Sequence, residues 1–291
     1  MDEIAIYELK RMDLRGSTVI EGFPSVGLVS TITANYLISI LKLEQIGVLD
    51  SVHFPTVSVV RNAEPLNPVR IYATNPQVHK DIPKLVVFIS EFQPSPQIIK
   101  MIASTILDWM QEQGCTLLIS PEGLVIDRDG EDEDEEGAVA EEEEEEEDPE
   151  AEADAGEEEE EGEGEDDELV NDVITYGIGS TDHARELITG QKIKLFEEGV
   201  ISGVAGVLLN EGKRRGFDVI SLLAEARPNY PDARAAARVI EAIDNILLKI
   251  DIDVKPLYSE AEGIEGRIKA MQKQAKPGVS KKPSHAPSMY G

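Results

Sequence analysis

An α/β fold, with a layered sheet flanked by helices, is predicted by three features of the sequence. Short runs rich in β-branched residues recur along the chain and alternate with helical patterns. Two of these runs, "KLVVFIS" and "CTLLIS", are continuously apolar, which is typical of strands that are covered on both faces. Between the runs, apolar residues recur three or four positions apart, as in helices that pack against a sheet. The sheet is therefore expected to be mostly parallel or mixed.

The elements can be placed along the chain from these patterns. The predicted strands are residues 17–23, 45–51, 56–61, 69–74, 84–90, 115–120, 172–178 and 217–226. The predicted helices are residues 27–42, 95–114, 198–216 and 232–250. In the first helix, apolar residues recur at every fourth position, and in the last they step by three and four.

The second helix has the clearest terminal signals. Ser95 is a good N-cap, Pro96 suits the first helical position and Gly114 suits the left-handed residue that ends a helix. The third helix is unusual because Gly199 and Gly203 fall in or near its first turns, followed closely by Gly206. Glycine lowers helix stability by up to about 1 kcal/mol per residue, so these positions predict a close approach of neighbouring backbone.

The negative charge of the chain is concentrated in one segment. Of 58 acidic residues, 29 lie between Asp127 and Glu168, where a single Arg is the only basic residue. The rest of the chain has 29 acidic and 26 basic residues and is close to neutral. The segment interrupts the alternation of strands and helices and has almost nothing apolar to bury. It is therefore predicted to be a disordered acidic insert between two strands of one sheet, and a loop of that length is tolerated because closure cost rises slowly with length.

The domain organisation follows from these segments. Residues 1–273 are predicted to form a single α/β domain, interrupted by the acidic insert 127–168. Residues 274–291, "QAKPGVSKKPSHAPSMYG", are rich in Gly, Pro, Ser and Lys and predict a flexible C-terminal tail.

The composition also narrows the class of protein. No apolar run reaches the roughly 18–20 residues that span a bilayer, and the N-terminal sequence lacks the features of a signal peptide. The single cysteine, Cys115, excludes an internal disulfide. These features predict a cytoplasmic protein without a membrane partner. Nucleic acid is an unsuitable partner because phosphates need Lys and Arg to neutralise them.

The "EGFPSVG" turn is a candidate site. It follows a strand and opens a helix, which is where glycine-rich turns can present backbone N–H groups to phosphate. The spacing of a dinucleotide fingerprint and the lysine of a P-loop are both absent. The favoured interpretation is a structural turn in which Gly22, Pro24 and Gly27 set the backbone and Phe23 packs nearby. An anion or nucleotide pocket is the alternative.

No catalytic residue, metal site or cofactor is predicted. The histidines His53, His79, His183 and His285 have no second His or Cys at the spacing of a metal site. Cys115 begins an apolar strand and is expected to lie in the core. The serine motif of the α/β-hydrolases is absent from the chain.

The last three residues form a second candidate site. Met289, Tyr290 and Gly291 place an apolar side chain, an aromatic ring with a hydroxyl group and a free carboxylate side by side. This ending suits insertion into a pocket that has a basic group at its base. The lysine-bearing tail ahead of it is long enough to reach a partner.

Three stretches of the chain resemble the archaeal branch of the proteasome assembly chaperone family. They are "VIEGFPSVGLVSTITANYLI", "ITYGIGST", and "GVISGVAGVLLNEGKRRGFDVISLLAEA" followed by "YPDARAAARVIEAI". The resemblance implies a fold like the phosphorylase/hydrolase-like fold of purine nucleoside phosphorylases, without enzymatic activity. Some archaeal members resemble proteasome activators in a hydrophobic–Tyr–any ending, which maps onto Met289, Tyr290 and Gly291. The acidic insert departs from the family pattern.

The resemblance implies an ATP-independent, archaeal proteasome assembly chaperone or activator. Its partners would be the α subunits of the proteasome core particle, with the Gly291 carboxylate paired to a lysine in a pocket between two subunits. Tyr290 would pack in that pocket and Met289 would fill its apolar wall. A cyclic homo-oligomer, possibly with a sister subunit, would present several tails at once. Whether the protein assists assembly or opens the gate is left open by the sequence.

Two other functions are kept as alternatives. The first is a small-molecule enzyme of the nucleoside phosphorylase type, with the Gly22–Gly27 turn as its anion site. It predicts Arg, Glu or His beside the turn and no role for the last three residues. The second is an interaction scaffold that binds a basic partner through the acidic insert 127–168.

Overall fold

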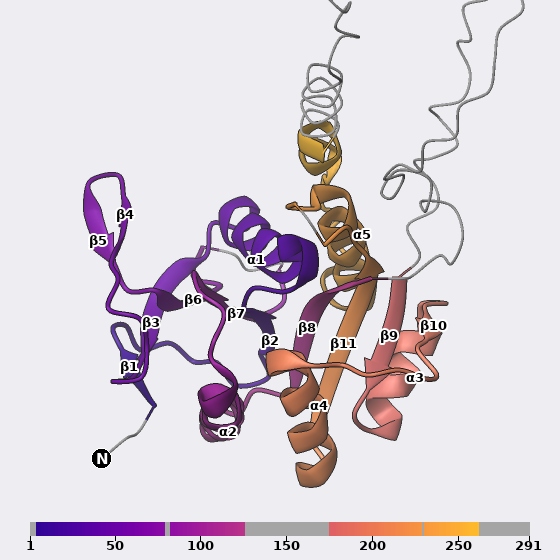
Figure 1. Cartoon of the computed structure of the whole chain (residues 1–291), viewed down its shortest axis with the longest axis horizontal. Coiled ribbons are helices and arrows are strands. Elements are labelled where there is room, and N and C mark those ends of the chain that lie inside the picture. The colour runs from indigo at the N-terminus through magenta and orange to yellow at the C-terminus, as the bar shows by residue number, and fades with distance from the viewer. Residues whose placement is uncertain (1–3, 79–81, 126–174, 229, 262–291) are drawn as a thin grey trace, which may run out of the picture.

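The computed structural model describes residues 4–78, 82–125, 175–228 and 230–261. A nine-stranded mixed sheet forms its centre, in the order β1-β3-β6-β7-β2-β8-β11-β9-β10 (Figure 1). Its strands are β1 (Ala5–Glu8), β2 (Thr18–Gly22), β3 (Glu44–Asp50), β6 (Val69–Ala73), β7 (Leu85–Ser90), β8 (Leu117–Leu124), β9 (Thr175–Gly179), β10 (Lys194–Leu195) and β11 (Asp218–Glu225). Strands β4 (Val59–Arg61) and β5 (Glu64–Leu66) form a separate two-stranded ribbon.

The middle of the sheet is parallel. β7, β2, β8 and β11 pair in parallel, as do β9 and β10. The pairs β1–β3, β3–β6, β6–β7 and β11–β9 are antiparallel. Every residue of β2 and β7 is buried, as expected for parallel strands with helices on both faces. The prediction of a mixed α/β sheet flanked by helices is therefore confirmed.

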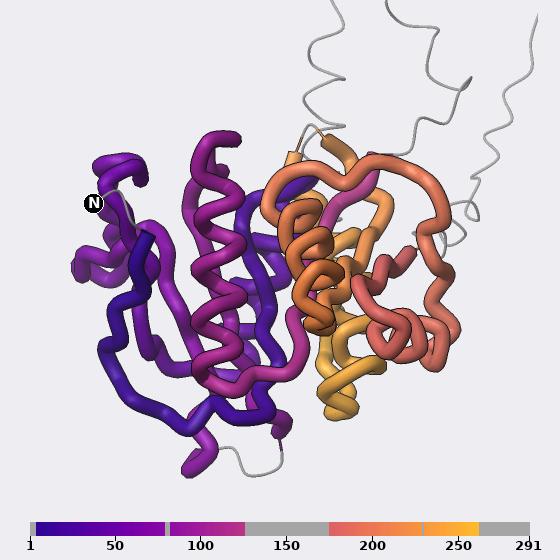
Figure 2. Tube along the Cα trace, turned by 90° about the horizontal axis from the view of Figure 1, so that it is seen from below, coloured from indigo at the N-terminus to yellow at the C-terminus, as the bar shows by residue number. Residues whose placement is uncertain are grey.

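Helices cover both faces of the sheet. α1 (Val29–Ile40) and α5 (Ala233–Ile243) pack on one face, where their apolar residues join one hydrophobic cluster. α2 (Pro96–Gln113) and α4 (Gly203–Arg215) lie side by side on the other face and supply a second cluster (Figure 2). α3 (Asp182–Gly190) lies beside β9. Adjacent residues of a strand alternate between the clusters, so that Val19 joins the second and Ile20 the first.

The termini of α2 match the sequence signals. Ser95 is extended, the helix begins at Pro96, and Gly114 ends it with a φ of 72°. A left-handed φ favours glycine because a Cβ would crowd the backbone there. α5 has a clear N-cap as well, because the Asp232 carboxylate accepts a hydrogen bond from the Ala235 N–H at 2.9 Å.

The other predicted helices differ from the structure at their ends. Gly27 and Leu28 have φ values of 60° and 52°, so α1 begins only at Val29, after a single 3₁₀ turn. Beyond α5, residues Asp244–Leu248 form a π-helical turn. The Asp244 carboxylate accepts the Ile250 N–H at 3.0 Å, which ends the helix by giving the backbone another partner.

The glycines of the third predicted helix have distinct roles. Gly199 precedes α4 and lies against the Phe196 ring, where a Cβ would be 2.5 Å from two ring carbons. Gly203 has a φ of 74° at the start of the helix. A Cβ on Gly206 would lie 2.2 Å from the Ile201 carbonyl oxygen. The expected close approach of backbone is thus found at Gly206 alone of the three.

Four elements were not expected from the sequence: β1, β5, β10 and α3. Each has nine residues or fewer, and short elements carry little periodicity of their own. A search of the described part of the chain finds no helix that is long and apolar enough to cross a membrane.

Candidate functional site

The turn that follows β2 lies at the edge of the sheet where four parallel strands end. β7, β2, β8 and β11 run in one direction, so their carboxyl ends meet. β2 leads through α1 to β3 on one side, whereas the strand after β8 is β9, beyond β11 on the other side. Neighbouring strands whose connections diverge in this way form a crevice at their carboxyl ends, where α/β proteins commonly bind ligands. A ligand site is therefore expected between β2 and β8.

The turn itself is tightly packed. Gly22, Phe23 and Gly27 are buried, and Pro24 is half-buried. Gly27 is left-handed and approaches the start of α5 closely, because its carbonyl oxygen accepts the Asp232 N–H at 2.8 Å. All four residues therefore shape the connection from β2 to α1.

Some backbone N–H groups in the turn and directly after it already have partners. The Phe23 N–H donates to Oε1 of Glu21 at 2.7 Å, and the Leu28 N–H donates to the Ser25 carbonyl at 2.9 Å. The Ser30 N–H donates to Oγ of Ser25 at 3.2 Å. An anion site needs several free N–H groups that point at one place. The N–H groups of Phe23, Leu28 and Ser30 are therefore not available to bind a phosphate.

Two carboxyl groups lie beside the turn on the face of the sheet that α2 and α4 cover. Glu21 on β2 is 1% exposed, and its Oε2 accepts the Ser120 hydroxyl at 2.6 Å. Glu122 on β8 is half-buried and also interacts with the Ser120 hydroxyl. Ser221 on β11 is in register with Ser120, is fully buried and has no hydrogen-bond partner among the described residues. Glu21, Ser120, Glu122 and Ser221 are called the carboxyl cluster below.

The surroundings of the carboxyl cluster favour the protonated acids. Burial raises the pKa of Glu21 to about 7, against the opposing hydrogen bonds from Ser120 and the Phe23 N–H. Burial, together with the nearby charge of Glu21, raises the pKa of Glu122 well above its usual value.

The carboxyl cluster was missed from the sequence, although a signal was present. Glu21 and Glu122 each interrupt an apolar strand, in "TVIEGF" and "LLISPEGL". Acidic residues are almost never fully buried unless they have a partner, so a glutamate at such a position is a candidate for an unusual site.

The Glu21→Gln variant is expected to lose less stability than the wild-type protein as pH rises. Because the pKa of Glu21 is raised in the folded state, the native protein binds more protons than the unfolded chain between about pH 4.5 and 7. The contribution of protonated Glu21 to the free energy of unfolding is complete below pH 4.5. It is lost as the pH rises through 7, which lowers the free energy of unfolding by on the order of 3 kcal/mol. Melting temperatures at pH 4.5, 6 and 8 measure the difference between the two proteins.

A matched control for this experiment is Glu64→Gln, which removes an exposed carboxylate on β5. The melting temperature of Glu21→Gln relative to the wild type should rise from pH 4.5 to pH 8, whereas that of Glu64→Gln should stay constant. A constant difference for both variants would show that Glu21 titrates in the folded protein as it does in the unfolded chain.

The other titratable candidates do not form a site. Cys115 is buried, and burial raises the pKa of its thiol to about 11, which leaves it protonated and unreactive. Nδ1 of His183 lies 2.6 Å from Oδ2 of Asp218 on the surface, and His53 lies in a loop. His79 and His285 lie outside the described residues. In the described ranges there is no group of three or more His, Cys, Asp or Glu residues that could hold a metal ion.

The segment that leads to the C-terminal tail is attached to the body. Residues 255–261 are helical and follow α5 at one end of the molecule (Figure 1). Val254 and Leu257 are buried in the cluster under α1 and α5, and the Tyr258 hydroxyl donates to Oε1 of Glu241 at 3.2 Å. The described chain therefore ends at a fixed point on the surface.

The predicted partner-binding residues lie beyond that point. Met289, Tyr290 and Gly291 are outside the described residues, as are the acidic insert 127–168 and the tail 274–291. The two strands that flank the insert, β8 and β9, are both in the nine-stranded sheet and are separated there by β11.

Solved structures with this fold include two proteins of the archaeon Pyrococcus furiosus. The chain is similar to Pyrococcus furiosus PbaA, an archaeal homologue of proteasome-assembly chaperone, with 25% identity and a TM-score of 0.70 over 92% of each chain. It also has the fold of Pyrococcus furiosus PbaB, an archaeal proteasome activator, with 24% identity and a TM-score of 0.69 over 94% of this chain and 100% of that one.

Sequence comparison agrees with the structures. An uncharacterised protein of Methanocaldococcus jannaschii is 25% identical over 100% of this chain and 99% of its own length. Residues 19–272 match the model of the PAC2 family. That match includes the turn and the carboxyl cluster, and it stops before the predicted tail, residues 274–291. The chain belongs to the PAC2 family.

Proposed function

We propose that this protein is an ATP-independent assembly chaperone or activator of an archaeal-type proteasome that docks its C-terminal tripeptide into pockets of the core particle. The observation that carries the proposal is similarity over 92% of the chain to PbaA, a homologue of proteasome-assembly chaperone. The Met289–Tyr290–Gly291 ending supplies the docking chemistry. Membership of the PAC2 family supports a binding role rather than catalysis.

The body is suited to act as a platform for the tail. Both faces of the sheet are covered by helices, and residues 254–261 are attached to the first hydrophobic cluster. A tail that starts from such a fixed point is tethered to one place on the body. Residues 262–291 follow this point in the chain and include the predicted tail, 274–291.

Each residue of the ending has a distinct role in the proposed contact. The Gly291 carboxylate pairs with a lysine in the pocket between two α subunits of the core particle. Tyr290 inserts its ring, which buries a large apolar area and leaves the hydroxyl group to a polar partner. Met289 fills the apolar wall of the pocket, where its flexible side chain adapts to the local shape.

Several copies of the tail are needed for tight binding. One tripeptide makes a small contact, whereas linked copies bind through a high effective concentration. A cyclic homo-oligomer, with or without a sister subunit, presents equivalent tails around one axis. The lysines of the tail steer it toward acidic surface, an effect that salt weakens.

A pull-down with archaeal core particle tests the proposal. The full-length protein is expected to capture core particle, whereas a variant that lacks residues 289–291 is expected to capture none above background. A Ser288→Ala variant, altered just before the tripeptide, serves as the matched control and should capture normally. Native mass spectrometry of the same samples gives the subunit number. Equal capture by the truncated and full-length proteins would contradict the proposal.

The likeness to the nucleoside phosphorylase fold and the role of the acidic insert both stay predictions. The likeness to the nucleoside phosphorylase fold is an expectation of the family resemblance, and the match to the PAC2 family and to PbaA makes a phosphorylase-type activity the less favoured alternative. The role of the acidic insert is tested separately by deleting residues 127–168 and repeating the pull-down. The deletion is expected to leave capture unchanged, because the tripeptide makes the contact.

A further inference from the structure

A cavity of about 290 Å³ lies on the α2 face of the sheet, at the edge that β1 forms. Figure 2 shows the N-terminal segment, in indigo, running alongside α2, in magenta. The volume is just below the range of pockets for drug-sized molecules, which suits a smaller ligand. The apolar side chains that line the cavity are Ile6, Met12, Leu14, Ile46, Ile71 and Trp109.

The cavity depends on a side chain that is missing from its floor. Glu8 of β1, Gly47 of β3 and Ile71 of β6 lie opposite one another on three neighbouring strands. Residues that are in register across a sheet point to the same face, so this row faces α2. A Cβ on Gly47 would lie 3.4 Å from Cδ1 of Ile71 and 3.0 Å from the Tyr7 carbonyl oxygen. The row therefore has a gap in its middle, between the Glu8 carboxylate and the Ile71 side chain.

Helix α2 supplies the opposite wall. Trp109 is 8% exposed, and its ring meets the Phe88 ring edge to face with centroids 5.5 Å apart. The indole N–H of Trp109 is buried and has no hydrogen-bond partner in the described part of the chain. A buried donor without a partner is a place where a ligand oxygen would add a hydrogen bond. Because the ring is fixed before binding, it loses little conformational entropy when a ligand packs against it.

The mouth of the cavity carries one loosely paired anion and cation. Nε of Arg11 lies 3.7 Å from Oε2 of Glu8, and the Arg11 side chain is 95% exposed. This distance exceeds that of a hydrogen bond, so both groups can accept a further partner. Oε1 of Glu8 accepts a hydrogen bond from Nε2 of Gln113 at 3.2 Å, which holds the carboxylate over the cavity. Lys10, the other cation in the lining, is paired with Glu44.

We propose that this cavity binds a free α-amino acid with a large apolar side chain, such as leucine. The apolar side chain fills the gap beside Gly47, the ammonium group pairs with Glu8 and the carboxylate pairs with Arg11. A ligand with a negative charge alone would be repelled by Glu8, and one with a positive charge alone would be repelled by Arg11. A zwitterion satisfies both groups at once. The site lies on the folded body and goes beyond the proposed function.

Titration of the full-length protein with L-leucine tests the proposal, because Trp109 is the single tryptophan of the chain and lines the cavity. The fluorescence of Trp109 is expected to change saturably, with a Kd below about 1 mM. Isothermal titration calorimetry should give the same Kd and one site per chain. A fluorescence change that does not saturate, or the absence of a binding heat, would overturn the proposal.

Three analogues of leucine separate the contacts. Glycine lacks the apolar side chain, isocaproate lacks the ammonium group and isopentylamine lacks the carboxylate. Each is expected to bind at least about tenfold more weakly than leucine, because each loses one of the three matched contacts. If isocaproate or isopentylamine bound as tightly as leucine, the cavity would recognise a single charge, and the assignment to an amino acid would be wrong.

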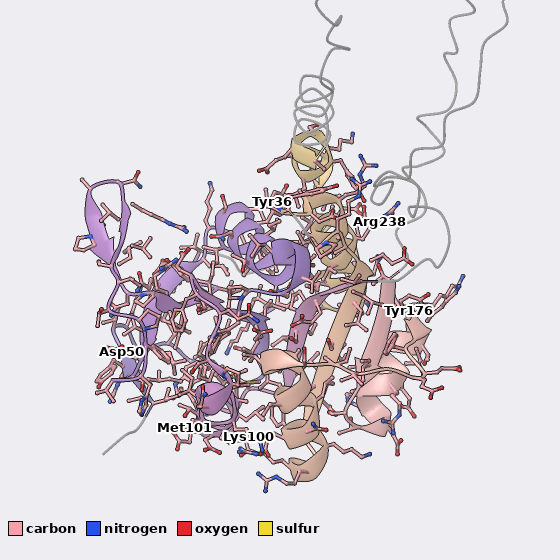
Figure 3. The ribbon with its side chains drawn as sticks, in the orientation of Figure 1. Tyr36, Asp50, Lys100, Met101, Tyr176 and Arg238 are labelled. Carbon is pink, nitrogen blue, oxygen red and sulfur yellow. The ribbon has the colours of Figure 1, made fainter. Side chains whose placement is uncertain are left out.

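Charge variants locate the binding at the mouth of the cavity. Glu8→Gln should weaken leucine binding about tenfold and leave isocaproate binding unchanged, whereas Arg11→Gln should weaken both. Both residues are exposed, so the variants are expected to fold. The matched control is Lys100→Gln, which alters an exposed lysine of α2 that does not line the cavity (Figure 3). Equal effects of all three substitutions, or no effect of any, would contradict the proposal.

Gly47→Ala tests the gap in the floor. The added methyl group occupies the space beside Ile71, so leucine binding should weaken at least about fivefold. The melting temperature of the variant, measured on the same sample, shows whether the protein is folded. Unchanged leucine binding in the folded variant would show that the ligand binds elsewhere.

These measurements are independent of the proposed function, because none of them uses core particle. If leucine binds with the expected dependence on Glu8 and Arg11 while core particle is not captured, the amino-acid site stands alone. If leucine does not bind while the full-length protein captures core particle, the proposed function stands and the amino-acid site does not exist.

Discussion

The Tyr290→Ala variant is expected to bind proteasome core particle at least about 10³-fold more weakly than the wild-type protein. A buried tyrosine at the centre of a contact contributes on the order of 2 kcal/mol, which is about a 30-fold change for a single tail. When two or more tails of one oligomer bind at once, the losses multiply. The same substitution should therefore have a much larger effect on the oligomer than on an isolated peptide.

Binding measurements on immobilised core particle can separate the effect of the substitution on the oligomer from its effect on a single tail. The intact protein and a monomeric tail peptide are compared, each with Tyr290 and with alanine in its place. Ser288→Ala provides the control that changes the tail outside the tripeptide. An effect of equal size on oligomer and peptide would show that only one tail binds at a time, and no effect on either would exclude Tyr290 from the contact.

The Gly22→Ala variant is expected to lose about 3 kcal/mol of folding free energy. A Cβ on Gly22 would lie 2.5 Å from Cβ of Ala34 in α1 and 2.7 Å from the carbonyl oxygen of Phe88 in β7. Neither neighbour can yield easily, since one belongs to a packed helix and the other to the backbone of a central strand. Overpacking of this kind costs 1–3 kcal/mol or more, so the melting temperature should fall by roughly 10 °C.

Gly190→Ala is the matched control for this prediction. Gly190 is the last residue of α3, and a Cβ there would have no neighbour within 4 Å. Alanine favours the helix by up to about 1 kcal/mol, so the melting temperature should stay constant or rise slightly. A comparable loss of stability in both variants would show that the close approach at Gly22 is not the cause. Thermal unfolding followed by circular dichroism measures both.

The central strands were predictable because a strand that is buried on both faces has a continuous run of apolar residues. β7 and β8 read as continuous apolar runs, and the caps of α2 are local features of Ser95, Pro96 and Gly114. The late start of α1 was not predictable, because Leu28 adopts a left-handed conformation that the surrounding turn imposes. The order of the strands was not predictable either, since β9 and β8 are consecutive strands with β11 between them.

The sequence alone determined the fold class, the position of the acidic segment and the chemistry of the last three residues. These depend on periodicity, composition and residue type, all of which are local. The tertiary structure alone decided that Glu21 and Glu122 share one hydroxyl group, and that Glu8, Gly47 and Ile71 line one cavity. These groups come from strands far apart in the chain, and only the pairing of strands in the sheet brings them together.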